Sequence, residues 1–182
     1  MVTERADTMQ GMSGSMHGGL SRLLIVDDDP ALLDALSGTL DARFSHFSLD
    51  TCDSGARALD LAKHQRYDTI IVDVNMPGMS GFDVLTAVKA LQPQTPVLLM
   101  TAHADETMMA KAFEEGAAAF IPKPFDRAHL VNAARLGVEL SRLQSATGTR
   151  EQRAATRDKI TALRHELRQQ SVRILSLIAI GL

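Results

Sequence analysis

Short apolar runs alternate along this chain with segments whose apolar residues recur every three or four positions, beginning at residue 22. A run of consecutive apolar residues is typical of a strand that is buried on both faces of a sheet. The pattern therefore predicts five strands, of which the second has the weakest signal. They lie at residues 23–26, 44–49, 69–72, 96–100 and 118–121.

The segments between these runs have helical spacing and carry helix start and stop signals. Pro30 suits a first helical turn, and Gly116 suits a helix end. Ser54 and Asp126 suit N-caps. The expected helices lie at residues 30–40, 54–62, 81–91, 106–115 and from 126 onward. Strands that alternate with helices pair in parallel through right-handed crossovers, so we predict an α/β fold around a five-stranded parallel sheet.

Polar residues follow four of the five predicted strands. In open parallel sheets the functional site lies at the carboxyl ends of the strands, so these residues should gather in one small area. Asp29 also follows the first strand, but we do not assign it to this site because we expect it to cap the helix that begins at Pro30. The strand-end residues are Asp27 and Asp28 after the first strand, Asp73 and Asn75 after the third, Thr101 after the fourth and Lys123 after the fifth.

Three of these residues, Asp27, Asp28 and Asp73, are carboxylates. Two such charges about 4 Å apart repel by roughly 4 kcal/mol at an effective dielectric constant near 20. Proteins tolerate such a cluster when a cation neutralises it, and an all-oxygen donor set suits Mg²⁺. The lysine and the threonine hydroxyl could then contact a phosphoryl group carried by one of the carboxylates.

Four segments together resemble the receiver domain of bacterial two-component response regulators. They are residues 24–30 (LIVDDDP), 71–81 (IVDVNMPGMSG), 100–102 (MTA) and 123–125 (KPF). Each segment alone is a weak signal, but their order and their place at strand ends make the set specific. The resemblance spans about residues 22–143 and implies a doubly wound (βα)5 fold of the flavodoxin-like, CheY-like kind.

The resemblance implies that Asp73 is the phosphoacceptor. It also implies that Asp27 and Asp28 form an acidic pocket for Mg²⁺, with Asp28 as the direct ligand. Asp73 itself and the backbone carbonyl of Asn75 would complete the protein ligands of the metal. The expected phosphoryl donor is a histidine kinase or a phosphotransfer protein.

The resemblance also implies a switch. Thr101 would supply its hydroxyl, and Lys123 would pair with the phosphoryl group. Phe120 stands where the family has an aromatic rotamer switch; it is Phe instead of the commoner Tyr, and plain core packing is the alternative. The family further suggests a cis peptide bond before Pro124. His103, beside Thr101, is expected to be a surface histidine of a loop.

Composition and charge divide the chain into parts. Hydrophobic residues make up 45% of the sequence, and Cys52 is the only cysteine, which suits a reducing cytoplasm. No apolar run is long enough to span a membrane. Residues 1–141 carry a net charge of −8, whereas residues 142–182 carry +5. The basic segment lacks interleaved aromatic residues, zinc ligands and a helix-turn-helix pattern, so nucleic-acid binding is not expected.

We therefore expect a flexible leader at residues 1–20, a receiver domain at 21–143 and a helical extension at 144–182. Apolar residues of the extension follow 3–4 spacing, which indicates a coiled-coil seam and a homodimer formed through the helix. Its positions are Ile160, Leu163, Leu167, Gln170, Ile174, Leu177 and Gly181. The alternative is a helix that folds back on its own receiver domain.

The extension contains a second, shorter resemblance. Residues 163–168 (LRHELR) are similar to the phosphoacceptor segment of histidine kinase dimerisation helices. His165 would then be a phosphorylated histidine, and the chain would be the receiver portion of a hybrid kinase whose dimerisation helix begins near residue 150. A charged residue on a helix face is the plainer interpretation, because neither a proline after Arg168 nor an ATP-binding domain follows.

The sequence thus predicts a cytoplasmic response regulator of a phosphorelay, which uses Mg²⁺ and is not an enzyme. A phosphatase with an aspartyl-phosphate intermediate would need a second acid two residues after Asp73, where Asn75 stands. The cognate kinase, the signal, the output pathway and the effect of phosphorylation on a dimer stay open, as does whether the chain is complete.

Overall fold

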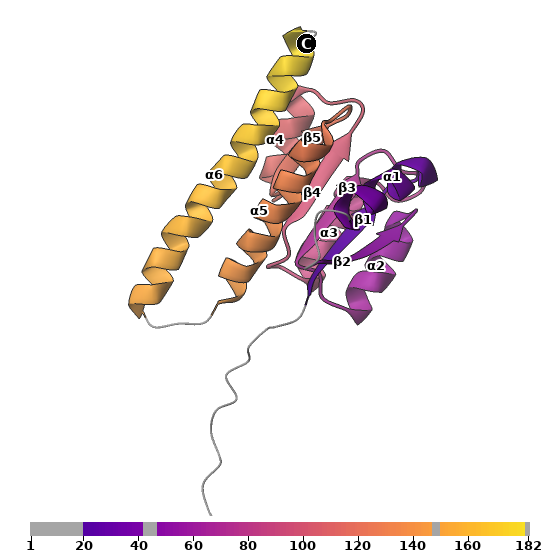
Figure 1. The fold of residues 1–182 in the computed structure, drawn as a ribbon. Helices are drawn as coiled ribbons and strands as arrows, with labels where there is room; N and C mark the ends of the chain where they lie inside the picture. Colours follow the sequence, from indigo (N-terminus) through magenta and orange to yellow (C-terminus); the bar gives the residue numbers. More distant parts are fainter. Residues whose placement is uncertain (1–19, 42–46, 147–149, 181–182) are drawn as a thin grey trace, which may run out of the picture.

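The computed structural model describes residues 20–41, 47–146 and 150–180. It contains one five-stranded parallel sheet with the strand order β2-β1-β3-β4-β5, which confirms the predicted fold class (Figure 1). The strands are β1 (Ser21–Val26), β2 (Phe47–Cys52), β3 (Thr69–Asp73), β4 (Val97–Thr101) and β5 (Ala119–Pro122).

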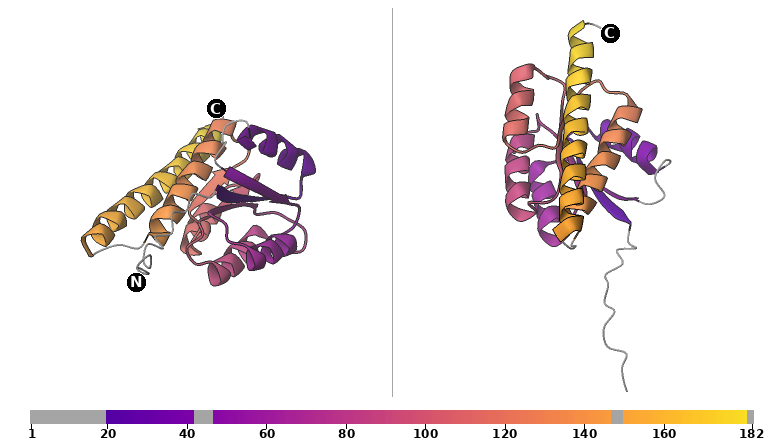
Figure 2. Two further views of the ribbon diagram at one scale, coloured as in Figure 1. Left: turned by 60° about the horizontal axis from the view of Figure 1, so that its bottom comes forward. Right: turned by 90° about the vertical axis from the view of Figure 1, so that its left-hand side faces the viewer.

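Helices cover both faces of the sheet (Figures 1 and 2). They are α1 (Pro30–Asp41), α2 (Gly55–His64), α3 (Gly81–Leu91), α4 (Glu106–Glu114), α5 (Arg127–Ser145) and α6 (Arg150–Ile180). Residues of α2, α3 and α4 share one buried cluster with the sheet, and residues of α1, α5 and α6 share the other. The sheet is therefore the middle of three layers.

The strand pattern explains this layering. In β1, Leu24 and Val26 belong to the cluster beneath α2 and α3, whereas Leu23 and Ile25 belong to the cluster beneath α1 and α5. Successive side chains of a strand point to opposite faces, so a continuous apolar run supplies both layers. The central strands are buried on both faces for this reason.

The expected helix signals mostly act as predicted. Asp29 accepts hydrogen bonds from the N–H groups of the first turn of α1, and Asp126 accepts one from Ala128 at the start of α5. Gly116 follows α4 with a φ of +94°, a conformation that favours glycine. Ser54 occupies the N-cap position of α2 without a side-chain cap bond, so there the prediction of a capping side chain was wrong.

The second strand differs from its predicted range. The pattern placed it at 44–49, but β2 begins at Phe47 and ends at the buried Cys52. Residues 44–46 lie outside the described residues, as does the predicted leader apart from Leu20. Register pairs Val26 with Cys52, so β2 extends alongside the whole of β1.

α6 folds back on its own receiver domain, as the alternative interpretation anticipated. It packs against β5 and α5, with Leu167 fully buried in their shared cluster (Figure 1). In the right-hand view of Figure 2, α6 runs in front of the sheet edge, between α4 and α5. Because β5 is an edge strand, α6 covers a row of backbone groups that would otherwise face solvent.

The buried face of α6 coincides with only part of the predicted heptad seam, because Ile160 and Leu163 pack against the cluster that contains Leu167 while later seam positions do not. Leu167, Ser171 and Leu175 are buried and repeat every four residues, whereas Leu177 of the predicted seam is 47% exposed. A straight helix drifts about 20° per heptad away from a strict 3.5-residue repeat. α6 packs against the receiver domain and not against a second supercoiled helix, so nothing holds it to a 3.5-residue repeat. Its buried stripe therefore diverges from the predicted seam toward the C-terminus.

Among the described residues, no helix is both long enough and apolar enough to cross a membrane.

Candidate functional site

An ammonium group holds two buried carboxylates together at the carboxyl ends of the strands. Lys123 Nζ lies 2.6 Å from Asp27 Oδ2 and 2.6 Å from Asp73 Oδ1. The side chains of Asp27 and Asp73 are only 1% and 6% exposed. Burial by itself would lower the pKa of Lys123, but its bonds to the two carboxylates outweigh burial and raise that pKa. The ammonium is therefore fixed in its charged form.

Strand register brings these residues together. β1 and β3 are neighbours and Val26 pairs with Val72, so the residues that follow, Asp27 and Asp73, lie side by side. Lys123 comes from the far edge, directly after β5, and its N–H donates to the carbonyl oxygen of Thr101 at 2.7 Å. Its long side chain then crosses the ends of β4 and β3 to reach both carboxylates. The expectation that strand-end residues would gather in one place is met for these groups.

The turn after β3 holds the second oxygen of Asp73. The N–H of Asn75 donates to Asp73 Oδ2 at 2.6 Å, and Asn75 Nδ2 donates to Thr101 Oγ1 at 2.8 Å. Thr101 Oγ1 also accepts from the N–H of His103 at 3.2 Å, while the His103 side chain is exposed, as expected of a loop histidine. Among the described residues, no acceptor is found for the hydroxyl proton of Thr101. Asp73 and Thr101 are thus connected through one asparagine.

Gly81 shapes this turn and was missed as a site residue. A Cβ atom at Gly81 would lie 2.4 Å from the backbone oxygen of Asp73, closer than any side chain tolerates. The N–H of Gly81 donates to Val74 O at 3.0 Å, so the start of α3 closes directly over the strand end. The signal in the sequence was a glycine at the first position of a predicted helix, where glycine has no intrinsic advantage.

The donor set at the site fits Mg²⁺. Asp27 and Asp73 share one ammonium between two negative charges, which leaves a net negative charge at a buried point, and Asp28 is exposed beside them. Mg²⁺ binds through one or two carboxylates and keeps several waters, so it does not need a complete protein cage. Within the described ranges, no group of three or more His, Cys, Asp or Glu side chains is close enough to hold a metal ion by itself.

Phe120 and Ser171 connect the sheet to α6. The Phe120 side chain is fully buried in the cluster beneath α3 and α4. Its N–H points away from β4 and donates to Ser171 Oγ at 2.9 Å, and Ser171 Oγ in turn donates to Leu167 O at 3.0 Å. Sequence reading missed Ser171. Its signal was a small polar residue midway between Leu167 and Leu175 at i+4 spacing.

Two other predicted features have definite places. The bond between Lys123 and Pro124 is cis, as the family resemblance suggested. His165 is exposed on α6, with one ring nitrogen 2.8 Å from the Gln169 amide nitrogen. The histidine does not belong to the group of residues around Asp73.

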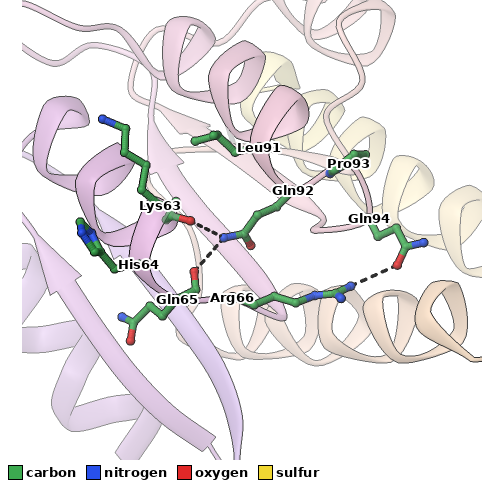
Figure 3. Close-up of a pocket in the computed structure, with 9 residues that line it drawn as sticks. Lys63, His64, Gln65, Arg66, Leu91, Gln92, Pro93 and Gln94 are labelled. Carbon is green, nitrogen blue, oxygen red and sulfur yellow. Dashed lines mark hydrogen bonds between the residues drawn. The ribbon is translucent and has the colours of Figure 1, made fainter.

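A cavity of about 480 Å³ lies away from this site, where α2 and α3 end (Figure 3). Its polar groups are largely paired with one another. Gln92 Nε2 donates to the carbonyl oxygens of Ala62 and Gln65, at 2.7 Å each, and Arg66 donates to Gln94. No carboxylate is among its described lining residues, so this cavity offers no group that could accept a phosphoryl group as Asp73 could.

Comparisons with known proteins agree with this geometry. The family model of the response regulator receiver domain matches residues 23–135 and ends before α6 begins. Response regulator protein FleR of Pseudomonas aeruginosa is 38% identical over 112 residues, which are 62% of this chain and 23% of FleR. The DNA-binding transcriptional regulator NtrC of Klebsiella pneumoniae is 37% identical over 102 residues, 56% of this chain and 21% of NtrC.

The chain thus spans less than a quarter of the length of these two relatives. Among solved structures, the chemotaxis protein CheY4 of Vibrio cholerae is 30% identical with a TM-score of 0.59. The match covers 64% of this chain and 98% of CheY4. Almost the whole of that structure therefore matches about two thirds of this chain.

Proposed function

The chain belongs to the response regulator receiver family of two-component systems, and from that premise we propose that Asp73 accepts a phosphoryl group and that α6 carries the response. The observation that carries the proposal is the bridge of Lys123 between Asp27 and Asp73. The phosphoryl donor is a histidine kinase or a phosphotransfer protein.

The transfer follows from the groups around Asp73. One carboxylate oxygen attacks the phosphorus of a phosphohistidine, a P–O bond forms, and the P–N bond breaks. The electron pair of that bond leaves with the imidazole of the donor, which takes up a proton from water. Lys123 Nζ can then bind a phosphoryl oxygen, because it already lies 2.6 Å from Asp73 Oδ1. The N–H of Asn75 holds the other carboxylate oxygen and so orients the nucleophile.

Asp27, Asp28, Asp73 and the backbone carbonyl of Asn75 are the residues that would hold Mg²⁺. When bound, the metal would supply positive charge that offsets the carboxylates and the charge of an incoming phosphoryl group. Asp27 is already fixed for this role, since its Oδ1 accepts the N–H of Asp29 at 3.0 Å and its Oδ2 binds Lys123. Asp28 is exposed beside Asp27 and is the more accessible of the two carboxylates.

A chain of contacts leads from Asp73 to α6. A phosphoryl group adds up to two negative charges and three acceptor oxygens, which favours a hydrogen bond from the hydroxyl of Thr101. Thr101 and Phe120 lie on the neighbouring strands β4 and β5, and the N–H of Phe120 binds Ser171 of α6. Movement of Thr101 and Phe120 would therefore change the support of α6.

The response we propose is a change in the docking of α6. The helix covers β5 and contacts α5, and its C-terminal part exposes Val172, Leu177 and Ile178. Release of the helix would uncover Leu167 as well, and the enlarged apolar stripe would favour a homodimer. The phosphoryl step then changes only the state of this protein, which makes the chain a regulator instead of an enzyme. We propose no contact with nucleic acid and a cytoplasmic location.

No feature of the site favours the hybrid kinase alternative. The helix that contains His165 is packed along its own receiver domain, so its buried face is not available for a kinase dimer in this arrangement.

The experiment that tests the proposal is labelling with acetyl phosphate and Mg²⁺, followed by intact mass measurement. The unchanged chain should gain one phosphoryl group, and Asp73→Asn should gain none. Asp60→Asn, an exposed aspartate on α2, is the matched control and should be labelled normally. Labelling of Asp73→Asn to the same extent would mean that another residue is the acceptor. Light scattering with beryllofluoride and Mg²⁺ then asks whether the mass changes only when Asp73 is intact.

A further inference from the structure

A partly open cavity of about 200 Å³ lies between α6 and the receiver domain, at the amino ends of β4 and β5. It is therefore at the opposite end of the sheet from Asp73. Its charged lining residues are Lys89 from α3 and Arg164 and Arg168 from α6, and no carboxylate is among its described lining residues. The remaining lining residues are Pro96, Gly116, Ala117, Ala118, Leu140 and Gln144.

The partners found for the three cations are neutral. Lys89 Nζ donates to the carbonyl oxygen of Thr95 at 2.9 Å, which leaves further N–H groups of the ammonium for another acceptor. The Arg168 guanidinium lies 5.0 Å from the ring centre of Phe113. Arg164 donates to the amide oxygen of Gln144 at 2.9 Å when that amide is oriented to suit its neighbours. Positive charge therefore accumulates here, and no carboxylate of the described part of the chain is found as its counter-ion.

The titration of Lys89 agrees with this accumulation. Burial and the neighbouring charge of Arg164 lower the pKa of Lys89 to about 8. The arginines at 164 and 168 are one helical turn apart, and like charges at that spacing destabilise a helix slightly. A chain that keeps this arrangement without any ligand loses stability both in the helix and in the cavity.

We propose that this cavity binds a small oxyanion of the phosphate class, which bridges Lys89 of the receiver domain to Arg164 and Arg168 of α6. Guanidinium groups bind such anions through two parallel N–H donors, and a lysine adds a point charge. The cavity is smaller than the roughly 300–1,000 Å³ typical of pockets for drug-sized ligands, so it fits a phosphate-sized group better than a nucleotide. The site is distinct from Asp73 and does not depend on phosphoryl transfer there.

A bridging anion should strengthen the docking of α6, because the complete site exists only while the helix lies on the receiver domain. A ligand that binds only the docked state multiplies the docking equilibrium by 1 + [L]/Kd, which is about tenfold at ten times Kd. The N–H of Phe120 reports this state directly, since its acceptor is Ser171 of α6. The exchange of this amide hydrogen slows as docking is strengthened.

The test is a titration of the full chain at pH 7 with inorganic phosphate, against chloride at matched ionic strength. Calorimetry measures binding, and hydrogen exchange of Phe120 measures docking. We expect saturable binding of phosphate, with exchange slowed in step. If phosphate and chloride act alike on the unchanged chain, or if phosphate binds without slowing the exchange of Phe120, the proposed site is wrong.

Variants assign the binding to this cavity. Arg164→Gln and Lys89→Met should each weaken phosphate binding by tenfold or more, and Arg164→Lys should weaken it less, because it keeps the charge but loses the two parallel donors. Arg153→Gln removes an exposed charge from the same helix and should bind normally. Lys63→Met removes a charge from the cavity of Figure 3 and should also bind normally. Loss of binding in Lys63→Met with retention in Arg164→Gln would refute the assignment.

Discussion

Two half-buried lysines at opposite ends of the sheet have pKa values that move in opposite directions. Burial opposes the charge of both side chains. At the carboxyl ends of the strands, the carboxylates of Asp27 and Asp73 reverse this effect and raise the pKa of Lys123. At the amino ends, no carboxylate of the described ranges pairs with Lys89, and burial together with Arg164 lowers its pKa to about 8. Whether carboxylates lie beside a half-buried lysine therefore decides the direction in which its pKa moves.

The two environments come from different parts of the molecule. Carboxylates gather around Lys123 because the strand register of a parallel sheet places successive strand ends side by side. Arginines gather around Lys89 because α6, which lies beyond the part that matches the receiver family, folds back over β5. The surroundings of Lys123 are a product of the receiver fold itself, whereas the surroundings of Lys89 depend on the added helix α6.

The same substitution at the two lysines should give the largest contrast. Lys123→Met leaves two buried carboxylates without their counter-ion, and breaking a buried ion pair in this way costs about 3–5 kcal/mol. Lys89→Met removes a buried charge that lacks an acidic partner and should leave the free energy of unfolding unchanged or raise it. Urea unfolding at pH 7 in phosphate-free buffer measures both. Equal losses in the two variants would contradict the comparison.

Leu167→Ala should remove the environment of Lys89 while leaving that of Lys123 intact. Leu167 is fully buried between α6 and the receiver domain, and truncation of a buried leucine costs about 2–5 kcal/mol, here mainly in the docking of α6. The pKa of Lys89 should then rise toward 10.5, and that of Lys123 should stay raised. NMR of isotope-labelled dimethyl-lysine measures both values. Leu177→Ala, on the exposed face of α6, should change neither.

Ser171→Ala should weaken docking by a smaller amount. The buried N–H of Phe120 would lose its acceptor, and an unsatisfied buried donor costs about 1–3 kcal/mol. Hydrogen exchange of Phe120 should become faster, with the pKa of Lys89 shifting in the same direction as in Leu167→Ala. Ser176→Ala is the matched control, because Ser176 also bonds the carbonyl four residues earlier but is exposed. Equal effects of the two serine variants would rule out a docking role for Ser171.

The pH dependence of stability should show the smallest effect. Between about pH 8 and 10.5 the unfolded chain keeps the proton of Lys89 while the folded chain releases it, so stability rises with pH. The charged groups that line the cavity with Lys89 are Arg164 and Arg168, both still protonated in this range. Cys52, whose pKa burial raises to about 11, has the opposite effect above about pH 9.

Comparison with Lys89→Met separates these contributions, because Cys52 is present in both chains. The stability of the unchanged chain relative to Lys89→Met should increase from about pH 8 to 10.5. A difference that stays constant over this range would mean that the Lys89 ammonium is not destabilised in the folded state.

Much of the site could be predicted from the sequence because the relevant signals are local. An apolar run of four or five residues is long enough to identify a buried strand, and the residue that follows it is then a strand end. Asp73 and Lys123 were found in this way, and the bridge that Lys123 forms between Asp27 and Asp73 follows from the common edge at which parallel strands end. The boundaries of β2 were shifted because its alternating, partly exposed residues give no continuous run.

The sequence by itself determined the α/β fold, the order of the strand-end residues and the helical nature of the extension. Only the tertiary structure decided which face of α6 is buried and against what. A stripe of apolar residues indicates that one face of a helix is packed, but the period of the stripe does not identify what the face packs against. The partner is the open edge of β5, where the backbone N–H of Phe120 requires an acceptor that Ser171 supplies. Backbone hydrogen-bonding groups are the same in every sequence, so the sequence does not reveal which of them lack a partner within the sheet. That is decided only when the fold places β5 at the edge.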